Sequence, residues 1–133
     1  MAKKKNRSLL DSSAVLALLR NEPGADVVEG ALGNSAMLSV QLAEVVKKLV
    51  DVGADEDSCR ERIEALFIPV VEEFSQAQAY NTTRYCAPGL SLGDRMCLSA
   101  ANWLEMPVLT SDRRWSERAA ERSDWNVEIH QIR

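Results

Sequence analysis

The chain has 133 residues, of which 46% are hydrophobic and 27% charged, and it carries a net charge of −4. These values fit one compact domain over residues 1–133 and exclude a disordered or fibrous protein. The negative charge also excludes a surface that is basic all round, so a nucleic acid would have to meet a local basic patch.

The cysteines and the N-terminus bear on the cellular compartment. The three cysteines are far apart and include no C-x-x-C pair, so we expect neither a disulfide framework nor a zinc site, as in a reducing cytoplasm. Residues 1–7 (MAKKKNR) are basic, and no apolar segment of signal-peptide or membrane-spanning length follows them. We therefore expect a cytoplasmic protein without membrane attachment. Its basic segment is interpreted as a solvated, disordered tail, with an RNA contact as the lesser alternative.

The first half of the chain predicts strands alternating with helices. Residues 8–10 indicate a strand that enters the core, and the following DSS supplies the N-cap chemistry of a helix. A later helix has its apolar stripe at i, i+3, i+4 and i+7, formed by Leu42, Val45, Val46 and Leu49. The other elements expected are a helix from Pro23 to Gly33-Asn34, a strand at 36–40, and a helix at 56–67 capped by Asp55.

The second half continues the alternation. An apolar run at 68–71 precedes helical composition at 72–87, a helix at 92–104, a strand at 108–110, a short helix at 114–122 and a last strand at 127–132. Strands that alternate with helices indicate a mainly parallel sheet with helices on both faces. The predicted fold class is therefore α/β, as a three-layer α/β/α domain.

Four acidic residues stand where strands give way to helices. Asp11 directly follows the first strand, and Asp112 follows the strand that ends at Thr110. Glu44 and Asp94 lie in the first turns of two later helices. Ligands bind at the carboxyl ends of the strands in open α/β sheets, so all four acids can face one edge.

Each acid also has an ordinary structural explanation. Asp11 and Asp112 can cap helices or close turns, and Ser91 with Asp94 fits the [ST]-x-x-[DE] capping box. Glu44 lies roughly opposite the apolar stripe of its helix, so periodicity assigns it to the solvated face.

The joint arrangement of the acids favours a bound cation. Asp94 falls on the apolar side of its helix, near Cys97 and Ala101, where a carboxylate is costly unless it is compensated. Converging carboxylates raise one another's pKa unless a cation neutralises them. Mg²⁺ and Mn²⁺ prefer oxygen ligands and can activate water against a phosphodiester. The hydroxyls of Ser13 and Thr110 are placed to orient these carboxylates or bound water.

Three segments carry a resemblance to a known family. LLDSSAVLALLRNEPG, LSVQLAEVVKKL and GLSLGDRMCLSAANWLEMPVLTSDRRW occur in this order. They contain an Asp with a Ser two residues on, an acid in the helix after the second strand, a G-D-x-x-x-x-A-x-x pattern and a late T-x-D-x-x-W. Over nearly its whole length the chain resembles the PIN-domain ribonucleases, specifically the VapC toxins of bacterial toxin–antitoxin pairs.

The resemblance implies a single PIN-like nuclease domain and a metal-dependent endoribonuclease. It assigns catalytic roles to Asp11, Glu44, Asp94 and Asp112, none of which is missing. Asp11, Asp94 and Asp112 correspond to ligands of one or two Mg²⁺ or Mn²⁺ ions, and Glu44 to a residue that positions metal or water. The implied substrate is a structured RNA such as tRNA or rRNA. The implied partners are a cognate VapB-like antitoxin and a second copy in a homodimer.

Other residues were weighed as contacts to RNA. Arg95, Arg113 and Arg114 flank two of the acids and are candidate phosphate contacts, with surface solubility or helix pairing as the alternative. Trp103 and Trp115 are interpreted as packing residues rather than platforms for bases. The only histidine stands in the last strand and offers no acid–base pair for a metal-free ribonuclease.

Other functions remain open from the sequence. A PIN nuclease that processes RNA or acts on DNA without an antitoxin would carry the same acids, and a non-catalytic PIN module would keep the fold alone. An aspartyl phosphatase would need D-x-D, but Ser13 occupies the third position. A phospho-receiver domain would need an acidic pair and a late lysine, which are not evident.

Overall fold

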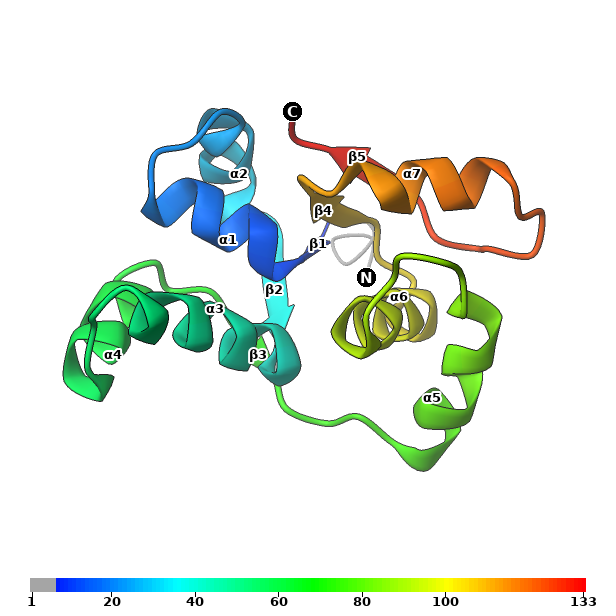
Figure 1. Cartoon of the computed structure of the whole chain (residues 1–133), viewed down its shortest axis with the longest axis horizontal. Coiled ribbons are helices and arrows are strands. Elements are labelled where there is room, and N and C mark those ends of the chain that lie inside the picture. Colours follow the sequence, from blue (N-terminus) through cyan, green and yellow to red (C-terminus); the bar gives the residue numbers. More distant parts are fainter. Residues whose placement is uncertain (1–6) are drawn as a thin grey trace.

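The computed structural model describes residues 7–133, so the predicted basic tail at 1–7 lies almost wholly outside the described residues. The strands and helices alternate along the chain as the sequence predicts (Figure 1). In chain order they are β1 (Ser8–Leu10), α1 (Ser12–Leu19), α2 (Ala25–Ala31), the 3-10 helix η2 (Leu32–Asn34), β2 (Ser35–Leu38), α3 (Ser39–Asp51), α4 (Glu56–Glu64), β3 (Val70–Val71), α5 (Gln76–Asn81), the 3-10 helix η3 (Thr82–Tyr85), α6 (Leu92–Leu104), β4 (Val108–Thr110), α7 (Arg113–Ala120) and β5 (Ile129–Gln131).

The strands form one five-stranded sheet in the order β3-β2-β1-β4-β5. Every pair of neighbouring strands is parallel. In the centre, Leu9 of β1 pairs with Ala36 of β2 on one side and with Val108 of β4 on the other. The predicted α/β class with a parallel sheet is thereby confirmed.

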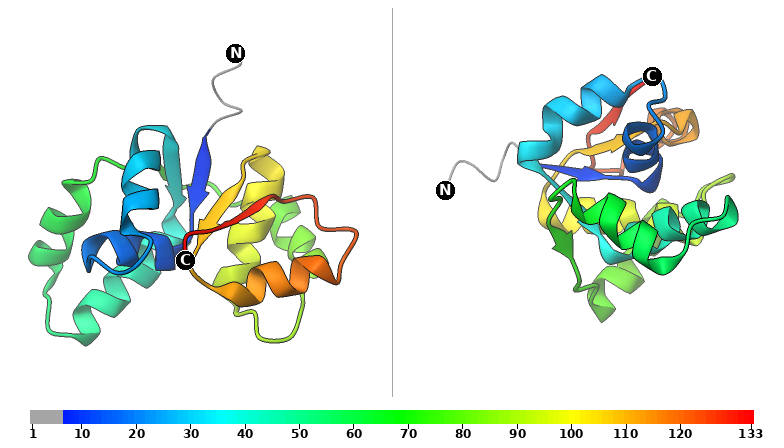
Figure 2. Two further views of the ribbon diagram at one scale, coloured as in Figure 1. Left: turned by 90° about the horizontal axis from the view of Figure 1, so that it is seen from above. Right: turned by 90° about the vertical axis from the view of Figure 1, so that its left-hand side faces the viewer.

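Side chains of the central strands alternate between two hydrophobic clusters, as the two-residue period of a strand requires. Leu9 joins the cluster with buried residues of α6 and with Trp115 of α7. Leu10 joins the cluster built on α1, α2, α3 and α4. Figure 2 shows these two groups of helices on opposite sides of the strands. The sheet is therefore the middle of three layers, as predicted.

Several boundaries differ from the sequence prediction. The strand expected at 36–40 is β2, which ends at Leu38 because α3 begins at Ser39. The helix expected to begin at Pro23 begins two residues later, after Gly24 adopts a left-handed conformation with φ 96°. Apolar composition alone could not place these ends, because it does not record the backbone conformation at which a helix begins. The shorter β5 and α7 differ from prediction only at their ends.

The two tryptophans that were predicted to pack behave differently. Trp115 is fully buried in the cluster that contains Leu9. The interpretation of Trp103 was wrong, because its side chain is 53% exposed. Residues 97–101 of α6 are buried, but the last turn of the helix, which contains Trp103, is exposed.

The cysteines are well separated and the helices are short. Cys59, Cys86 and Cys97 are free thiols, and only Cys86 is exposed. Over residues 7–133, every helix falls short of the length and apolar character that a membrane span requires.

A pair of glycines near α2 tests how the C-terminus docks on the fold. A Cβ at Gly24 would lie 2.6 Å from the backbone oxygen of Ile132, and φ there is +96°, whereas a Cβ at Gly30 in α2 meets nothing within 4 Å. We predict that Gly24→Ala lowers the free energy of unfolding by more than about 1 kcal/mol. The matched Gly30→Ala raises it by about 0.5–1 kcal/mol, because alanine is the better helix residue. Urea unfolding measures both, and equal stability of the two variants would contradict the docking of Ile132.

Candidate active site

The strand order places a topological switch point between β1 and β4. From β1 the chain builds the sheet to one side through β2 and β3, and then returns to add β4 and β5 on the other side. In open α/β sheets such a switch point, at the carboxyl ends of the strands, is where ligands bind. Asp11 follows β1 at this edge, and Asp112 follows β4. Helix α6 leads into β4, so its first turn, with Asp94, starts from the same edge.

Asp11 is buried at this edge with only 3% of its surface exposed. Its Oδ2 accepts hydrogen bonds from Ser13 Oγ at 2.6 Å and from Thr110 Oγ1 at 2.9 Å. Its Oδ1 is also buried but has no hydrogen-bond partner among the described residues. Although Asp11 occupies the N-cap position of α1, its side chain makes no cap hydrogen bond. The carboxylate is therefore held by hydroxyls and presents one free oxygen.

The hydroxyls around Asp11 form a small network between the ends of β1 and β4. Ser13 Oγ lies 3.2 Å from Thr110 Oγ1 and accepts a hydrogen bond from the backbone N–H of Ser111 at 3.0 Å. The backbone N–H of Asp112 donates to Thr110 Oγ1 at 3.0 Å. The placement of Ser13 and Thr110 beside Asp11 matches the sequence interpretation. The network ties the end of β1 to the loop after β4.

Burial raises the pKa of Asp11 to about 6. The hydrogen bonds from Ser13 and Thr110 oppose this rise, whereas the charges of Asp94 and Glu44 add to it. Ionising this carboxyl group therefore costs more free energy in the folded protein than in the unfolded chain. A nearby cation would remove that cost.

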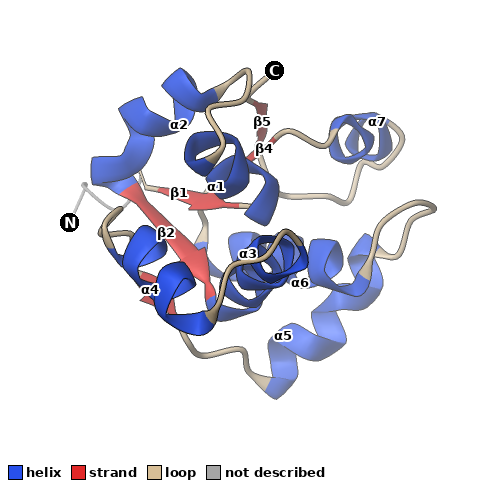
Figure 3. Cartoon of the chain, turned by 60° about the vertical axis from the view of Figure 1, so that its left-hand side comes forward, coloured by secondary structure: helices blue, strands red, loops and turns tan. Residues whose placement is uncertain are grey.

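Glu44 is half-buried on the side of α3 that faces α6, and the two helices lie side by side (Figure 3). A Cβ added to Gly93 of α6 would clash with Glu44 Oε2, so a larger residue there would require the carboxylate to move. Gln41 holds the contact, because its Nε2 donates to the Gly93 carbonyl at 2.9 Å and to Glu44 Oε1 at 3.4 Å. The assignment of Glu44 to the solvated face by periodicity was therefore wrong.

The error at Glu44 comes from the buried face of α3. Gln41 is fully buried and takes part in the core row with Val45 and Leu49, whereas Leu42 is only partly buried. When only apolar residues are counted, Gln41 is left out, and the buried face of α3 is estimated to point further from Glu44 than it does. Burial raises the pKa of Glu44, a hydrogen bond from Ser12 lowers it, and the charge of Asp94 raises it again. Sequence reasoning missed Gln41, Gly93 and Ser12; the Gly-Asp pair was the only signal.

Asp94 forms the capping box that the sequence suggested. Its Oδ2 accepts from the backbone N–H of Ser91 at 2.9 Å, and its own N–H donates to Ser91 Oγ at 3.2 Å. Burial raises the pKa of Asp94, the hydrogen bonds from Ser91 oppose this, and the charge of Asp112 adds to the rise. Cys97, one turn further along α6, is fully buried, and after burial itself the charges of Asp11, Glu44 and Asp94 raise its pKa.

Asp112 caps α7, as its ordinary explanation predicted. Its Oδ1 accepts from the backbone N–H of Arg114 at 3.0 Å, and Arg114 also forms an ion pair with Oδ2 at 2.7 Å. Partial burial works to raise the pKa of Asp112, but the hydrogen bonds and charge of Arg114 outweigh it and the pKa lies below its usual value.

The four acids are neighbours but do not form a closed coordination group. Over residues 7–133, no three side chains of His, Cys, Asp or Glu converge closely enough to hold a metal ion as they stand. Asp94 accepts a hydrogen bond from Ser91 and Asp112 is paired with Arg114, so these two carboxylates already have partners of their own. The acids nevertheless act on one another. The charges of Asp94 and Glu44 raise the pKa of Asp11, and the charge of Asp112 raises the pKa of Asp94.

The donor set fits a hard divalent cation. It consists of carboxylates, with hydroxyls beside Asp11, and oxygen donors are what Mg²⁺ and Mn²⁺ prefer. Asp11 Oδ1, which is buried and unpartnered, is the kind of orphaned acceptor that a cation or its water satisfies. Burial is the largest cause of the raised pKa values of Asp11, Glu44 and Asp94, and the charges of neighbouring acids add to each rise, so a cation would favour the ionised forms.

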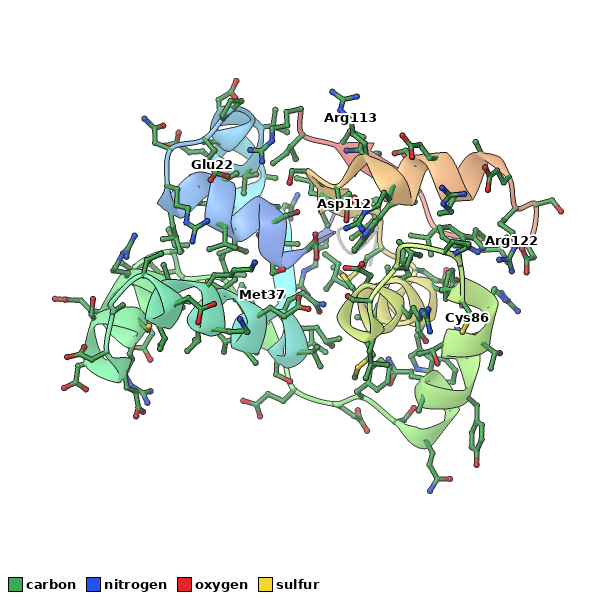
Figure 4. The ribbon with its side chains drawn as sticks, viewed as in Figure 1. Glu22, Met37, Cys86, Asp112, Arg113 and Arg122 are labelled. Carbon is green, nitrogen blue, oxygen red and sulfur yellow. The ribbon has the colours of Figure 1, made fainter. Side chains whose placement is uncertain are left out.

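The remaining predicted contacts are spread around the site. Arg114 is exposed beside Asp112, and Arg113 is exposed with its side chain directed outward (Figure 4). Arg95 is partly buried, and its Nε has no hydrogen-bond partner among the described residues. His130 lies at the far strand β5, beside Glu128. All three candidate phosphate contacts, Arg95, Arg113 and Arg114, lie in the first turns of α6 and α7.

The fold and the acid cluster are matched by one family model. The model of the PIN domain matches residues 8–121. The chain belongs to the PIN-domain family. PIN domains are nucleases, so the coarse reaction class is hydrolysis of a phosphodiester bond. The match includes Asp11, Glu44, Asp94 and Asp112, and residues 122–133, with β5, lie beyond it.

Solved structures share this PIN fold at low identity. VapBC2 from Rickettsia felis, bound to a DNA fragment from its promoter, matches with a TM-score of 0.70 and 13% identity over 94% of this chain and 98% of that one. VapBC-1 from nontypeable Haemophilus influenzae matches with a TM-score of 0.61 and 18% identity over 95% and 98%. A search of curated proteins gives no match. At these identities the structural likeness shows the fold alone.

The raised pKa of Asp11 predicts how metal-free stability depends on pH. The native state holds the Asp11 proton more tightly than the unfolded chain does. The contribution of Asp11 to stability is therefore fully present below the ordinary pKa of 3.8 and is lost as pH rises through about 6. Between pH 4 and 7.5 this single group removes up to about 3 kcal/mol.

Asp11→Asn isolates that titration. We predict that the free energy of unfolding of the wild type in EDTA, minus that of Asp11→Asn, falls by up to about 3 kcal/mol from pH 4 to 7.5. Any fixed cost of the amide cancels in this trend. Urea unfolding at several pH values measures it, and a difference that does not change with pH would contradict the buried, proton-binding state of Asp11.

Gly93→Ala tests the contact between α3 and α6. The new methyl group would displace Glu44 Oε2, whereas Gly33→Ala, whose Cβ meets nothing within 4 Å, serves as the control. If Glu44 takes part in the nuclease reaction, we predict that Gly93→Ala lowers kcat/KM for phosphodiester cleavage by about 10²-fold, the cost of misplacing a reacting group by about 1 Å. Wild-type activity in Gly93→Ala would mean that the position of Glu44 does not matter to the chemistry.

Proposed function

We propose that the chain is an Mg²⁺- or Mn²⁺-dependent endoribonuclease that acts as the toxin of a toxin–antitoxin pair. The observation that carries the proposal is the set of four carboxylates at the switch point of a PIN domain, one of which keeps a buried oxygen without a partner. The proposed catalytic residues are Asp11, Glu44, Asp94 and Asp112, with Asp11, Asp94 and Asp112 as metal ligands.

The chain's own residues would divide the work. Asp11, locked by Ser13 and Thr110, would be the fixed ligand, because its geometry is set before any cation arrives. Asp94 and Asp112 would turn from their caps toward the shared site. Glu44, packed on Gly93, would position an attacking water on the side of α3. When bound, a divalent ion supplies charge for the phosphate oxygens and lowers the pKa of water.

An RNA substrate is supported by the basic residues next to the acids. Arg114 and Arg113 open α7, and Arg95 follows Asp94 in α6, so three arginines stand in the first turns of the two helices that carry Asp94 and follow Asp112. Such a local patch meets phosphate where the net charge of −4 does not. We propose these three as phosphate contacts, and a structured RNA such as tRNA or rRNA as the substrate in the cytoplasm.

Partners are proposed from the structural neighbours and from the sequence resemblance. Both neighbours are VapBC assemblies. We propose that this chain likewise meets a VapB-like antitoxin, and that it forms a homodimer. A small antitoxin-like reading frame beside the gene and suppression of toxicity by its product would support this partner. An active nuclease without such a frame would favour the RNA-processing or DNA-acting alternative.

Asp94→Asn is the sharpest test of the proposed chemistry. The amide oxygen can still accept from the backbone N–H of Ser91, so the cap of α6 is retained while the charge is lost. We predict that this variant keeps its melting temperature in EDTA, loses the stabilisation by Mn²⁺ seen in the wild type, and cleaves RNA about 10²–10³-fold more slowly. Thermal melts and cleavage assays with Mg²⁺ or Mn²⁺ measure these effects.

Asp55→Asn is the matched control, because Asp55 also caps a helix through its side chain but lies on α4. It should retain activity and toxicity. Mapping RNA ends after induced expression identifies the substrate. A wild-type protein that cleaves no cellular RNA and leaves growth unharmed would refute the proposed function, and a non-catalytic PIN module would then be the better explanation.

A further inference from the structure

Arg114 occupies both carboxylate oxygens of Asp112. Its backbone N–H and its Nε each donate to Oδ1 at 3.0 Å, and its Nη2 donates to Oδ2 at 2.7 Å. This is the bidentate arrangement in which a guanidinium matches the geometry of a carboxylate. One proposed metal ligand is thus already neutralised by a residue of the same chain.

The surroundings hold Arg114 close to a second acid. A Cβ at Gly89 would lie 3.3 Å from Arg114 Cδ, and Gly89 has φ +86°, so the glycine allows the loop before α6 to pass against the arginine stem. Asp112 is the largest influence on the raised pKa of Arg114, and Asp94 contributes in the same direction. The guanidinium therefore lies where it acts on two of the four acids.

We propose that Arg114 is a positioning residue that holds Asp112 out of the metal site, and that at least one Asp112 oxygen must leave it before a divalent cation binds. The inference rests on the proposed function, because it takes Asp112 to be a metal ligand. Arg114 thereby sets the affinity of the site for metal. Once released, its exposed side chain is free to meet a substrate phosphate.

Competition is the physical reason. A cation that binds Asp112 must replace the two side-chain hydrogen bonds from Arg114, and the guanidinium also repels a second positive charge. The pair is partly exposed, with side-chain exposures of 55% for Arg114 and 20% for Asp112, so the contact is modest in strength and reversible. The backbone N–H of Arg114 keeps its own bond to Asp112 whatever the side chain does, so the helix cap does not depend on the guanidinium.

Arg113 provides a matched comparison. It begins the same helix and carries the same charge, but over residues 7–133 it makes no hydrogen bond or ion pair with an acidic side chain, and its side chain points outward (Figure 4). Arg113→Ala and Arg114→Ala remove equal charge from the same turn. Any difference between them reports the contact with Asp112 rather than the general field.

The test is Mn²⁺ titration of the EDTA-treated, desalted full chain, followed by electron paramagnetic resonance of the free ion. We expect Arg114→Ala to bind Mn²⁺ about two- to fivefold more tightly than the wild type, the range that corresponds to an exposed ion pair. Arg113→Ala should bind like the wild type, and thermal melts in EDTA should coincide for all three proteins. In the Asp112→Asn background, Arg114→Ala should no longer tighten binding.

The outcomes separate the two proposals. If Arg114→Ala binds Mn²⁺ no more tightly than Arg113→Ala, the role of Arg114 is refuted while the metal site stands. If Arg114→Ala tightens binding equally with and without the Asp112 carboxylate, the role through Asp112 is refuted. If none of the proteins binds Mn²⁺, the proposed metal-dependent function fails and this inference fails with it.

Discussion

The buried carboxylate of Asp11 is the constraint on which the site depends. It sits at the end of the central strand, where β1 is flanked by β2 and β4, and the parallel sheet leaves it no solvent. One oxygen is satisfied by hydroxyls of Ser13 and Thr110, and the other by nothing among the described residues. A fold that keeps such a group gives up stability at neutral pH, because ionisation there is costly. The proposed cation would return that stability when it binds.

The other acids are held more loosely, each by a local device. Asp94 and Asp112 serve as helix caps, and the carboxylate of Glu44 packs against Gly93. A cap needs only a short side-chain oxygen near the helix start, so these residues can exchange their backbone partner for another at small cost. The site combines one rigid ligand with adjustable neighbours. The guanidinium of Arg114 fits this scheme, since it supplies positive charge to an adjustable acid until another cation competes for it.

Periodicity and capping rules predicted much of the molecule. The limits of β1, α6 and β4 agree with the sequence because strong signals bound them: the DSS cap, the Ser91 capping box and the break after Leu104. The burial of Trp115 was also predicted correctly. The predicted packing of Trp103 was wrong, because only tertiary structure shows which turns of α6 are buried. Glu44 was misplaced by periodicity, since a buried glutamine rather than an apolar residue completes the face of α3.

The sequence by itself determined the class of fold, the acids that directly follow β1 and β4, and the hydroxyls beside Asp11, because these follow from alternation, cap chemistry and short spacings along the chain. Tertiary structure alone decided which acid is buried, which are turned aside by caps, and that Gln41 and Gly93 join α3 to α6. It also decided that Arg114 neutralises Asp112. The physical reason is the same in each case: burial and pKa depend on neighbours that are distant in sequence, and no local pattern records them.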